Sequence, residues 1–174
     1  NALAIGDGAS ADGIRTAAIG RNASAAGTNS TALGQGSNAS GVNAFALGVR
    51  PDATGSQSLA IGTDTVASNV QSVGVGFSAN SSGRQSVAIG SFANSAGQNS
   101  IAIGRNSSSA HDNSSAFGFG AATTMANQMM LGSSSTTYVM PGITTTLSKD
   151  RQSGAIYYVT SDGSGNLATS DDPI

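Results

Sequence analysis

The sequence contains no cysteine, no tryptophan and no glutamate, and only 9% of its 174 residues are charged. Without cysteine, the chain has no disulfides and no thiolate metal sites. The seven Lys and Arg residues are scattered and the net charge is −2, so nucleic acids and anionic membranes are poor partners. No stretch approaches the roughly 20 apolar residues of a membrane-spanning helix. We therefore expect a domain that is not embedded in a membrane.

What the chain does contain is mostly Ala, Ser, Gly, Asn and Thr, a mixture that would indicate disorder if it had no pattern. A strict period excludes that interpretation, because a disordered chain has no reason to keep register. Ten glycines stand 14 residues apart with no insertion or deletion, at Gly6, Gly20, Gly34, Gly48, Gly62, Gly76, Gly90, Gly104, Gly118 and Gly132. A fixed repeat length is typical of solenoids, in which each repeat lies on the one before it.

One repeat is predicted to form one two-stranded coil of an all-β solenoid. Each glycine follows an alternating segment such as Val87-Ala88-Ile89, which places large residues on one strand face and small residues on the other. A second glycine, such as Gly97, follows seven residues later, and two turns with two strands of about five residues account for the repeat length. Asn69 and His111 replace this second glycine in two repeats, and we expect both to adopt positive φ.

Side-chain amides recur five residues before the first glycine of each repeat. They are Asn29, Asn43, Gln57, Gln71, Gln85, Asn99, Asn113 and Asn127. Coils stacked about 4.8 Å apart would form a rod roughly 45–50 Å long. The amides would then either hydrogen-bond along the rod as a ladder or serve simply as turn-forming residues, and the sequence leaves both interpretations open.

The Ala and Ser positions predict association between chains. A coil this short encloses only a few side chains, which is a thin core for a single chain. We expect the small, flat Ala/Ser face to let a second backbone approach closely, so that three such faces could surround a shared axis. The alternative is that this face is ordinary solvent-exposed surface.

The unit Asn99-Ser100-Ile101-Ala102-Ile103-Gly104 and its sister Gln85–Gly90 resemble the YadA-like head repeat of trimeric autotransporter adhesins. The resemblance covers residues 1–132 in ten consecutive copies. It implies a left-handed parallel β-roll in each chain and a homotrimer with three chains side by side. It also implies display on a Gram-negative outer membrane, binding to host matrix proteins such as collagen, fibronectin or laminin, and in some members self-association.

Residues 133–174 depart from the repeat and are expected to form a β-rich base or connector toward a stalk. The runs Thr136–Met140 and Ala155–Thr160 are strand-like, and turns are predicted at Pro141-Gly142 and over Ser161–Asn166. Segments similar to Asp162–Ala168 precede the stalk in these adhesins. No neck motif and no heptads are recognisable. Because the chain starts at Asn1 already in repeat phase, it is expected to be a piece of a longer protein.

No catalytic, cofactor-binding or metal-binding residues are predicted, and the ligand-binding residues cannot be assigned. His111 is the only histidine and occupies a turn position. The aspartates and arginines fall at several repeat phases, which argues against paired catalytic carboxylates and against a calcium-binding roll with its nine-residue period. The sequence thus predicts an adhesive head domain rather than an enzyme. A passive spacer that carries another binding domain is the alternative, and an enzyme on a β-helix is a third possibility.

Overall fold

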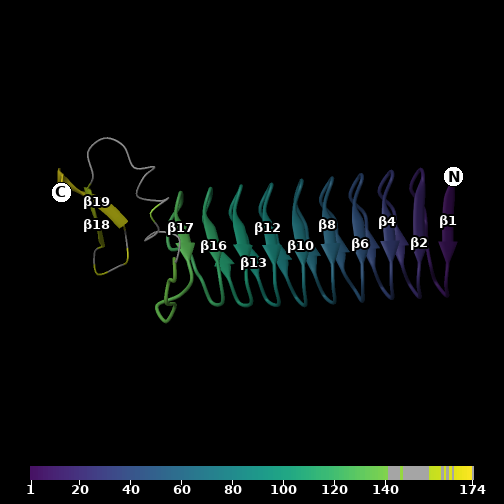
Figure 1. Ribbon diagram of the computed structural model, residues 1–174. Coiled ribbons are helices and arrows are strands. Elements are labelled where there is room, and N and C mark those ends of the chain that lie inside the picture. The colour runs from purple at the N-terminus through teal and green to yellow at the C-terminus, as the bar shows by residue number, and fades with distance from the viewer. Residues whose placement is uncertain (141–145, 147–156, 162, 164, 166, 174) are drawn as a thin grey trace. The chain divides into compact units, whose positions relative to one another are not determined.

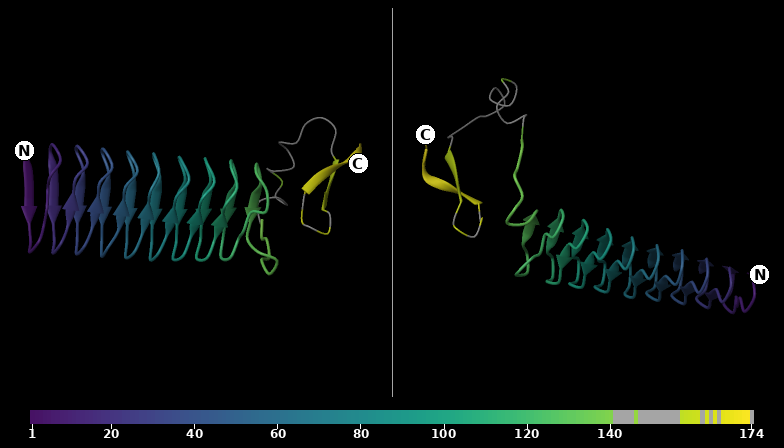
Figure 2. Two further views of the ribbon diagram at one scale, coloured as in Figure 1. Left: turned by 180° about the vertical axis from the view of Figure 1, so that it is seen from behind. Right: turned by 90° about the horizontal axis from the view of Figure 1, so that it is seen from below.

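In the computed structural model, the described residues are 1–140, 146, 157–161, 163, 165 and 167–173. The chain divides into two compact units, Asn1–Thr136 and Thr137–Ile174. The first unit is a parallel β-solenoid whose rungs stack in a single row (Figures 1 and 2). The predicted all-β solenoid is therefore confirmed.

Two parallel sheets form the walls of the solenoid. The ten-stranded sheet contains β1 (Ala2–Ile5), β2 (Thr16–Ile19), β4 (Thr31–Leu33), β6 (Phe45–Leu47), β8 (Leu59–Ile61), β10 (Val73–Val75), β12 (Val87–Ile89), β14 (Ile101–Ile103), β16 (Ser115–Phe117) and β17 (Met129–Leu131). The seven-stranded sheet contains β3 (Ser24–Ala25), β5 (Asn38–Ala39), β7 (Asp52–Ala53), β9 (Val66–Ala67), β11 (Asn80–Ser81), β13 (Asn94–Ser95) and β15 (Ser108–Ser109). The strands are mostly three and two residues long, shorter than the five predicted, because the turns take up more of each repeat.

Every strand pairing in the solenoid joins residues 14 positions apart. Val73 pairs with Val87 in the long-strand sheet, and Asn80 pairs with Asn94 in the short-strand sheet. An insertion in one repeat would shift every later residue out of register with its neighbour, and a one-residue slip would exchange inward and outward side chains. The uniform repeat length therefore follows from the stacking.

The interior of the solenoid consists mostly of Ala and Ser, which corrects the arrangement expected from the sequence. From β2 to β16 the middle residue of each long strand, such as Ala60 or Ala102, is buried, and the Ala and Ser residues of the short strands are buried opposite it. The large apolar residues on either side, such as Ile101 and Ile103, point outward and are half-buried or exposed. The physical reason is that seven residues per wall bring the two sheets close together, so that only small side chains fit between them.

Serine pairs cross this interior in the C-terminal half of the solenoid. Ser81 and Ser86 are joined by a hydroxyl–hydroxyl hydrogen bond of 2.6 Å, and the next two coils repeat the arrangement. The Ser86 hydroxyl also donates to the carbonyl of Gly83 at 2.7 Å. Each buried hydroxyl of this pair therefore has a partner, which offsets the cost of removing it from water.

One coil shows how tightly the interior is filled. Thr65 is the largest fully buried side chain, and the residue that faces it is Gly74, where the other coils between β2 and β16 have Ala. A Cβ on Gly74 would stand 2.9 Å from the Thr65 Cγ2 and 2.8 Å from the Val66 carbonyl oxygen. The larger residue on one wall thus compensates for the smaller one on the other.

Gly74→Ala is expected to destabilise the solenoid by about 1–3 kcal/mol, because the added methyl overpacks the interior against Thr65. In a Thr65→Ala background the same substitution should cost less, since the clash with the Thr65 methyl is removed and only the close approach to the Val66 carbonyl oxygen remains. A double-mutant cycle of thermal unfolding free energies measures this coupling, which we expect to exceed about 1 kcal/mol. Additive effects of the two substitutions would show that the two side chains do not share one space.

The turns depend on two kinds of constraint. The first glycine of each repeat adopts a positive φ, for example 135° at Gly104, where L side chains rarely stand. The second glycine does not, and the expectation of positive φ at Asn69 and His111 is wrong. At Gly83, a Cβ would instead overlap the carbonyl oxygen of Gly97 in the next coil. Close stacking, rather than backbone conformation, therefore selects glycine at this second position.

The recurring amides have both of the predicted roles. They adopt positive φ, as at Asn99 (55°), and so form the turn before each long strand. They also hydrogen-bond along the rod, with the Asn29 amide donating to Asn43 at 2.9 Å and the Asn99 amide donating to Asn113 at 3.0 Å. The ladder is thus confirmed for these pairs, and it combines turn geometry with contacts between coils.

The second unit contains an antiparallel pair of strands, β18 (Tyr157–Ser161) and β19 (Leu167–Pro173). The predicted strand over Ala155–Thr160 is confirmed at its described end, whereas Ala155 and Ile156 lie outside the described residues. The predicted strand over Thr136–Met140 is wrong, because these residues have no regular secondary structure. The predicted turn at Pro141-Gly142 and part of that over Ser161–Asn166 also lie outside the described residues.

Candidate interaction surfaces

The outward side of the ten-stranded sheet forms a continuous surface that we call the apolar face. Each long strand contributes the two residues that flank its central inward residue, for example Val87 and Ile89 in β12. Most of these residues are Ile, Leu, Val, Phe or Met, and none is charged. Exposed apolar surfaces of this extent on a folded domain indicate a contact with another molecule.

The outward side of the seven-stranded sheet is the polar face. Its strands present Ser24, Asn38, Asp52, Val66, Asn80, Asn94 and Ser108, all half-buried. Neighbouring side chains on this face are hydrogen-bonded, with the Asn38 amide donating to Asp52 at 2.6 Å and the Asn80 amide donating to Asn94 at 3.0 Å. The two sheets therefore give the solenoid one apolar side and one mostly polar side.

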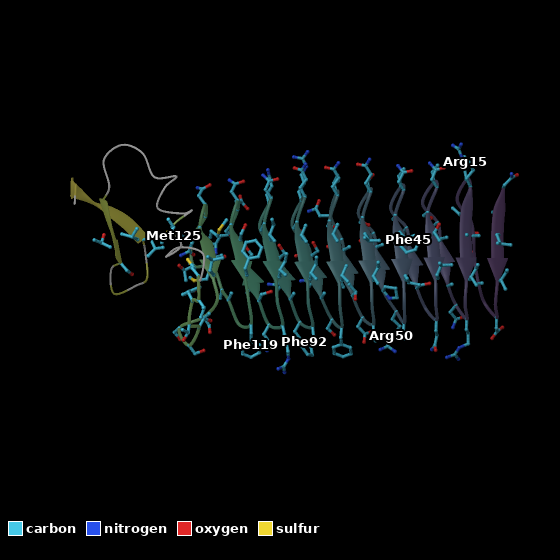
Figure 3. All side chains as sticks on the ribbon, in the orientation of Figure 1. Arg15, Phe45, Arg50, Phe92, Phe119 and Met125 are labelled. Atoms are coloured by element: carbon cyan, nitrogen blue, oxygen red, sulfur yellow. The ribbon has the colours of Figure 1, made fainter. Side chains whose placement is uncertain are left out.

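Two edges separate these faces, and they lie on opposite sides of the coil (Figure 3). The leading edge consists of the two residues that lie four and three positions before the central inward residue of each long strand. It carries Arg15, which precedes β2. The trailing edge consists of the two residues that follow the first glycine, and it carries Arg50, Phe92 and Phe119. Most of the charged side chains of the solenoid lie on these edges.

An exposed ion pair joins two consecutive coils on the trailing edge. The Arg50 guanidinium donates from Nε to Asp64 Oδ1 at 2.7 Å and from Nη2 to Oδ2 at 2.8 Å. These hydrogen bonds hold the pKa of Asp64 below its usual value. The contribution of the pair is present above the unfolded-state pKa of an aspartate and is lost as the pH falls through the lowered value. It is small because the pair is exposed to solvent.

The trailing edge also carries an aromatic cluster that the sequence analysis did not single out. The rings of Phe77 and Phe92 meet edge to face with centroids 5.2 Å apart, and the Arg105 guanidinium lies 5.7 Å from the centroid of Phe119. Three of the five phenylalanines therefore stand exposed on one edge, within four consecutive coils. The sequence feature that could have identified this cluster is the shared position of the three phenylalanines, one or two residues after the first glycine of their repeats.

The polar residues considered for catalysis serve the coil itself. His111 lies in a turn in which its backbone carbonyl accepts the Ser114 hydroxyl at 2.6 Å. Asp12 accepts from Ser10 at 2.6 Å, and Asp112 accepts from the Gln98 backbone at 2.8 Å. Within the described ranges, no group of three or more His, Cys, Asp or Glu side chains is placed to hold a metal ion. Among those same residues, no helix has the length and apolar character needed to cross a bilayer.

These features define a β-solenoid repeat protein that presents extended faces and edges for contacts. The family model described as the YadA head domain repeat matches residues 1–23, 25–50, 53–73, 67–93 and 95–121. The chain therefore belongs to the family of YadA head domain repeats, and it is an adhesin-type head domain.

A solved structure supports the same assignment. The crystal structure of the collagen-binding domain of the Yersinia adhesin YadA is similar to this chain, with 28% sequence identity and a TM-score of 0.55. The similarity covers 81% of this chain and 86% of that domain. A comparison with curated proteins gives no match. The predicted family resemblance is thus confirmed at the level of both sequence and fold.

Proposed function

We propose that this chain is the adhesive head of a trimeric autotransporter adhesin, in which three copies pack side by side through their apolar faces. The observation that carries the proposal is the uncharged apolar face, which runs along the ten-stranded sheet and whose large side chains are half-buried or exposed among the residues that the structure describes. The adhesive role is supported by the family of the chain and by its similarity to a collagen-binding domain.

Packing the apolar faces together would give the assembly the large-residue core that a single chain lacks. Within one coil the core consists of Ala and Ser, whose burial stabilises far less than burial of Ile or Val. Residues such as Leu59 and Ile103 stand half-buried or exposed in one chain and would be enclosed between three. The Ala/Ser surface, which the sequence analysis assigned to this contact, is unavailable because it lies inside the coil.

The same packing leaves the polar faces outward on a bacterial surface, as expected for an exposed passenger domain. Their Ser, Asn and Asp side chains repeat at every coil, so that one trimer offers many similar polar contacts to a fibrous ligand. Weak contacts of this kind become strong in combination, because each additional one forms at high effective concentration. Matrix proteins of the collagen, fibronectin or laminin class are the proposed ligands, and collagen comes first because a relative binds it.

Solid-phase binding with the full chain tests the proposal. We expect saturable binding to immobilised triple-helical collagen and none to immobilised albumin, with fibronectin and laminin measured in parallel. Light scattering on the same sample reports whether three chains associate. A folded trimer that binds none of these proteins would support the passive spacer instead, whereas a folded single chain would contradict the trimeric assembly.

A further inference from the structure

The aromatic cluster of the trailing edge is an exposed patch in the C-terminal half of the rod. It consists of Phe77, Phe92, Arg105 and Phe119, which lie in four consecutive coils. The two rings that meet edge to face are still about half exposed, and Phe119 is 63% exposed. Figure 3 shows Phe92 and Phe119 on the same edge of the rod. The contacts within the cluster therefore leave much of its aromatic surface in water.

The backbone at Phe92 is held in a conformation that does not suit phenylalanine. Its φ is 59°, in the left-handed region, where bulky residues are rare and cost stability. The equivalent residues of the two neighbouring coils are Ser78 and Asn106, which are typical turn residues. The contact with Phe77 offsets part of the cost, but the Phe92 side chain is still 51% exposed. A strained and exposed ring of this kind indicates a binding surface.

A positive charge without a counter-charge stands among the rings. The Arg105 guanidinium lies over the ring of Phe119, and no carboxylate of the described residues is within ion-pair distance of it. The trailing-edge residues of these four coils, 77–78, 91–92, 105–106 and 119–120, include no acid. The guanidinium can therefore donate to carbonyl or carboxylate groups of a ligand. Aromatic residues and arginine are both enriched in the contact surfaces of proteins.

The spacing of the coils along the rod matches the pitch of a polyproline II helix. Phe92 and Phe119 belong to coils that are two repeats apart, which is roughly 9.6 Å at the usual distance between strands. A polyproline II chain has three residues per turn and rises roughly 9.3 Å in one turn. Proline rings at i and i+3 of a chain that runs along the rod would therefore each reach one phenyl ring. Arg105 lies in the coil between them, and the carbonyl groups of such a chain have no internal partners.

We propose that the aromatic cluster binds a polyproline II chain of a collagen triple helix. Proline rings three residues apart pack on Phe92 and Phe119, and a carbonyl or carboxylate oxygen accepts from Arg105, as in other aromatic surfaces that bind proline-rich chains. The proposal rests on the proposed function and adds the place where the ligand docks. A triple helix carries glycine at its axis and turns its other side chains outward. Since it is rigid, it loses less conformational freedom on binding than a single proline-rich chain does.

The charges along the trailing edge favour a ligand over a second copy of this chain as the occupant. Besides Arg105, this edge carries Asp7, Arg21 and the exposed ion pair of Arg50 with Asp64. Enclosing these charges between chains would cost free energy, whereas the apolar face has no charge to enclose. In the proposed trimer the trailing edge therefore stays in contact with water, where a ligand can reach it.

Binding of a synthetic triple-helical Gly-Pro-Pro peptide to variants of the full chain tests the proposal. Phe119→Ser and Phe92→Asn should each weaken binding about tenfold, because each removes one ring from the contact. Phe92→Asn should change Tm little, since relief of the strained φ offsets the lost contact with Phe77. Val49→Ser is the matched control, because Val49 is an exposed apolar residue of the same edge outside the cluster, and it should bind like the natural chain. Single-chain oligoproline should bind at least about tenfold more weakly than the triple helix.

The outcomes separate this site from the proposed function. If the natural chain binds the triple helix and both phenylalanine variants bind as well as Val49→Ser, the site is wrong although the chain still binds collagen. Equal binding of oligoproline and the triple helix would overturn the choice of ligand. If light scattering gives both phenylalanine variants, but not Val49→Ser, less than the mass of three chains, the cluster belongs to the contact between chains and the proposal fails. A folded trimer of the natural chain that does not bind the triple helix would contradict the proposed collagen binding, and with it this site.

Discussion

Gly104→Asn is expected to destabilise the solenoid by about 3 kcal/mol or more. The φ of Gly104 is 135°, a conformation that costs an L residue on the order of 1–3 kcal/mol. In addition, a Cβ at this position would stand 2.6 Å from the carbonyl carbon of Gly118 in the next coil. That carbonyl belongs to a stacked backbone, so it cannot move without disturbing the coils on either side. Thermal unfolding followed by circular dichroism should show a correspondingly large fall in Tm.

Gly120→Asn provides a control with the same substituent in the following turn. Gly120 also has a positive φ, of 64°, but nothing lies within 4 Å of a Cβ built on it. The equivalent residue of the preceding coil is Asn106, at a φ of 58°. Since Asn tolerates this conformation, the substitution should change the free energy of unfolding by less than about 0.5 kcal/mol. Similar losses from the two variants would show that stacking distance does not select the repeat glycines.

The architecture was predictable from the sequence because one constraint acts on every repeat. Residues 14 apart pair in the sheets, and a turn glycine recurs with the same spacing, so the coil length is visible without knowledge of the side-chain packing. The amide ladder was predictable for the same reason. The strand over Thr136–Met140 was not, because outside the repeat a short run of Thr, Tyr and Val gives only a local propensity, which tertiary context overrides.

The direction of the strand faces could not be read from the alternation. Val87-Ala88-Ile89 alternates in the same way whether Ala88 or its neighbours point inward. The usual rule that large apolar residues are buried favours the wrong choice. The distance between the two sheets decides which residues point inward. That distance follows from the short walls and from pairs such as Thr65 with Gly74, which can be recognised only in the three-dimensional arrangement.

Val87→Lys is expected to convert the proposed trimer to single chains at micromolar concentration. Val87 is half-buried on the apolar face between Val73 and Ile101, with which its strand pairs. In one chain the lysine can extend into water, so the solenoid should still fold. In a trimer three ammonium groups would be buried near a shared axis without counter-charges, at a cost of several kcal/mol per chain. Sedimentation equilibrium measures the resulting loss of association, which should exceed about a thousandfold.

Val66→Lys is the matched control, because Val66 is likewise a half-buried valine in the middle of the rod but lies on the polar face. Its strand neighbours are Asp52 and Asn80, which suit a lysine, so the variant should retain the mass of three chains. Comparison of the two variants on immobilised collagen then connects assembly to adhesion. If binding depends on contacts multiplied over the trimer, Val87→Lys should bind at least about a hundredfold more weakly than Val66→Lys. Equal masses for the two variants would place the contact between chains on some other surface.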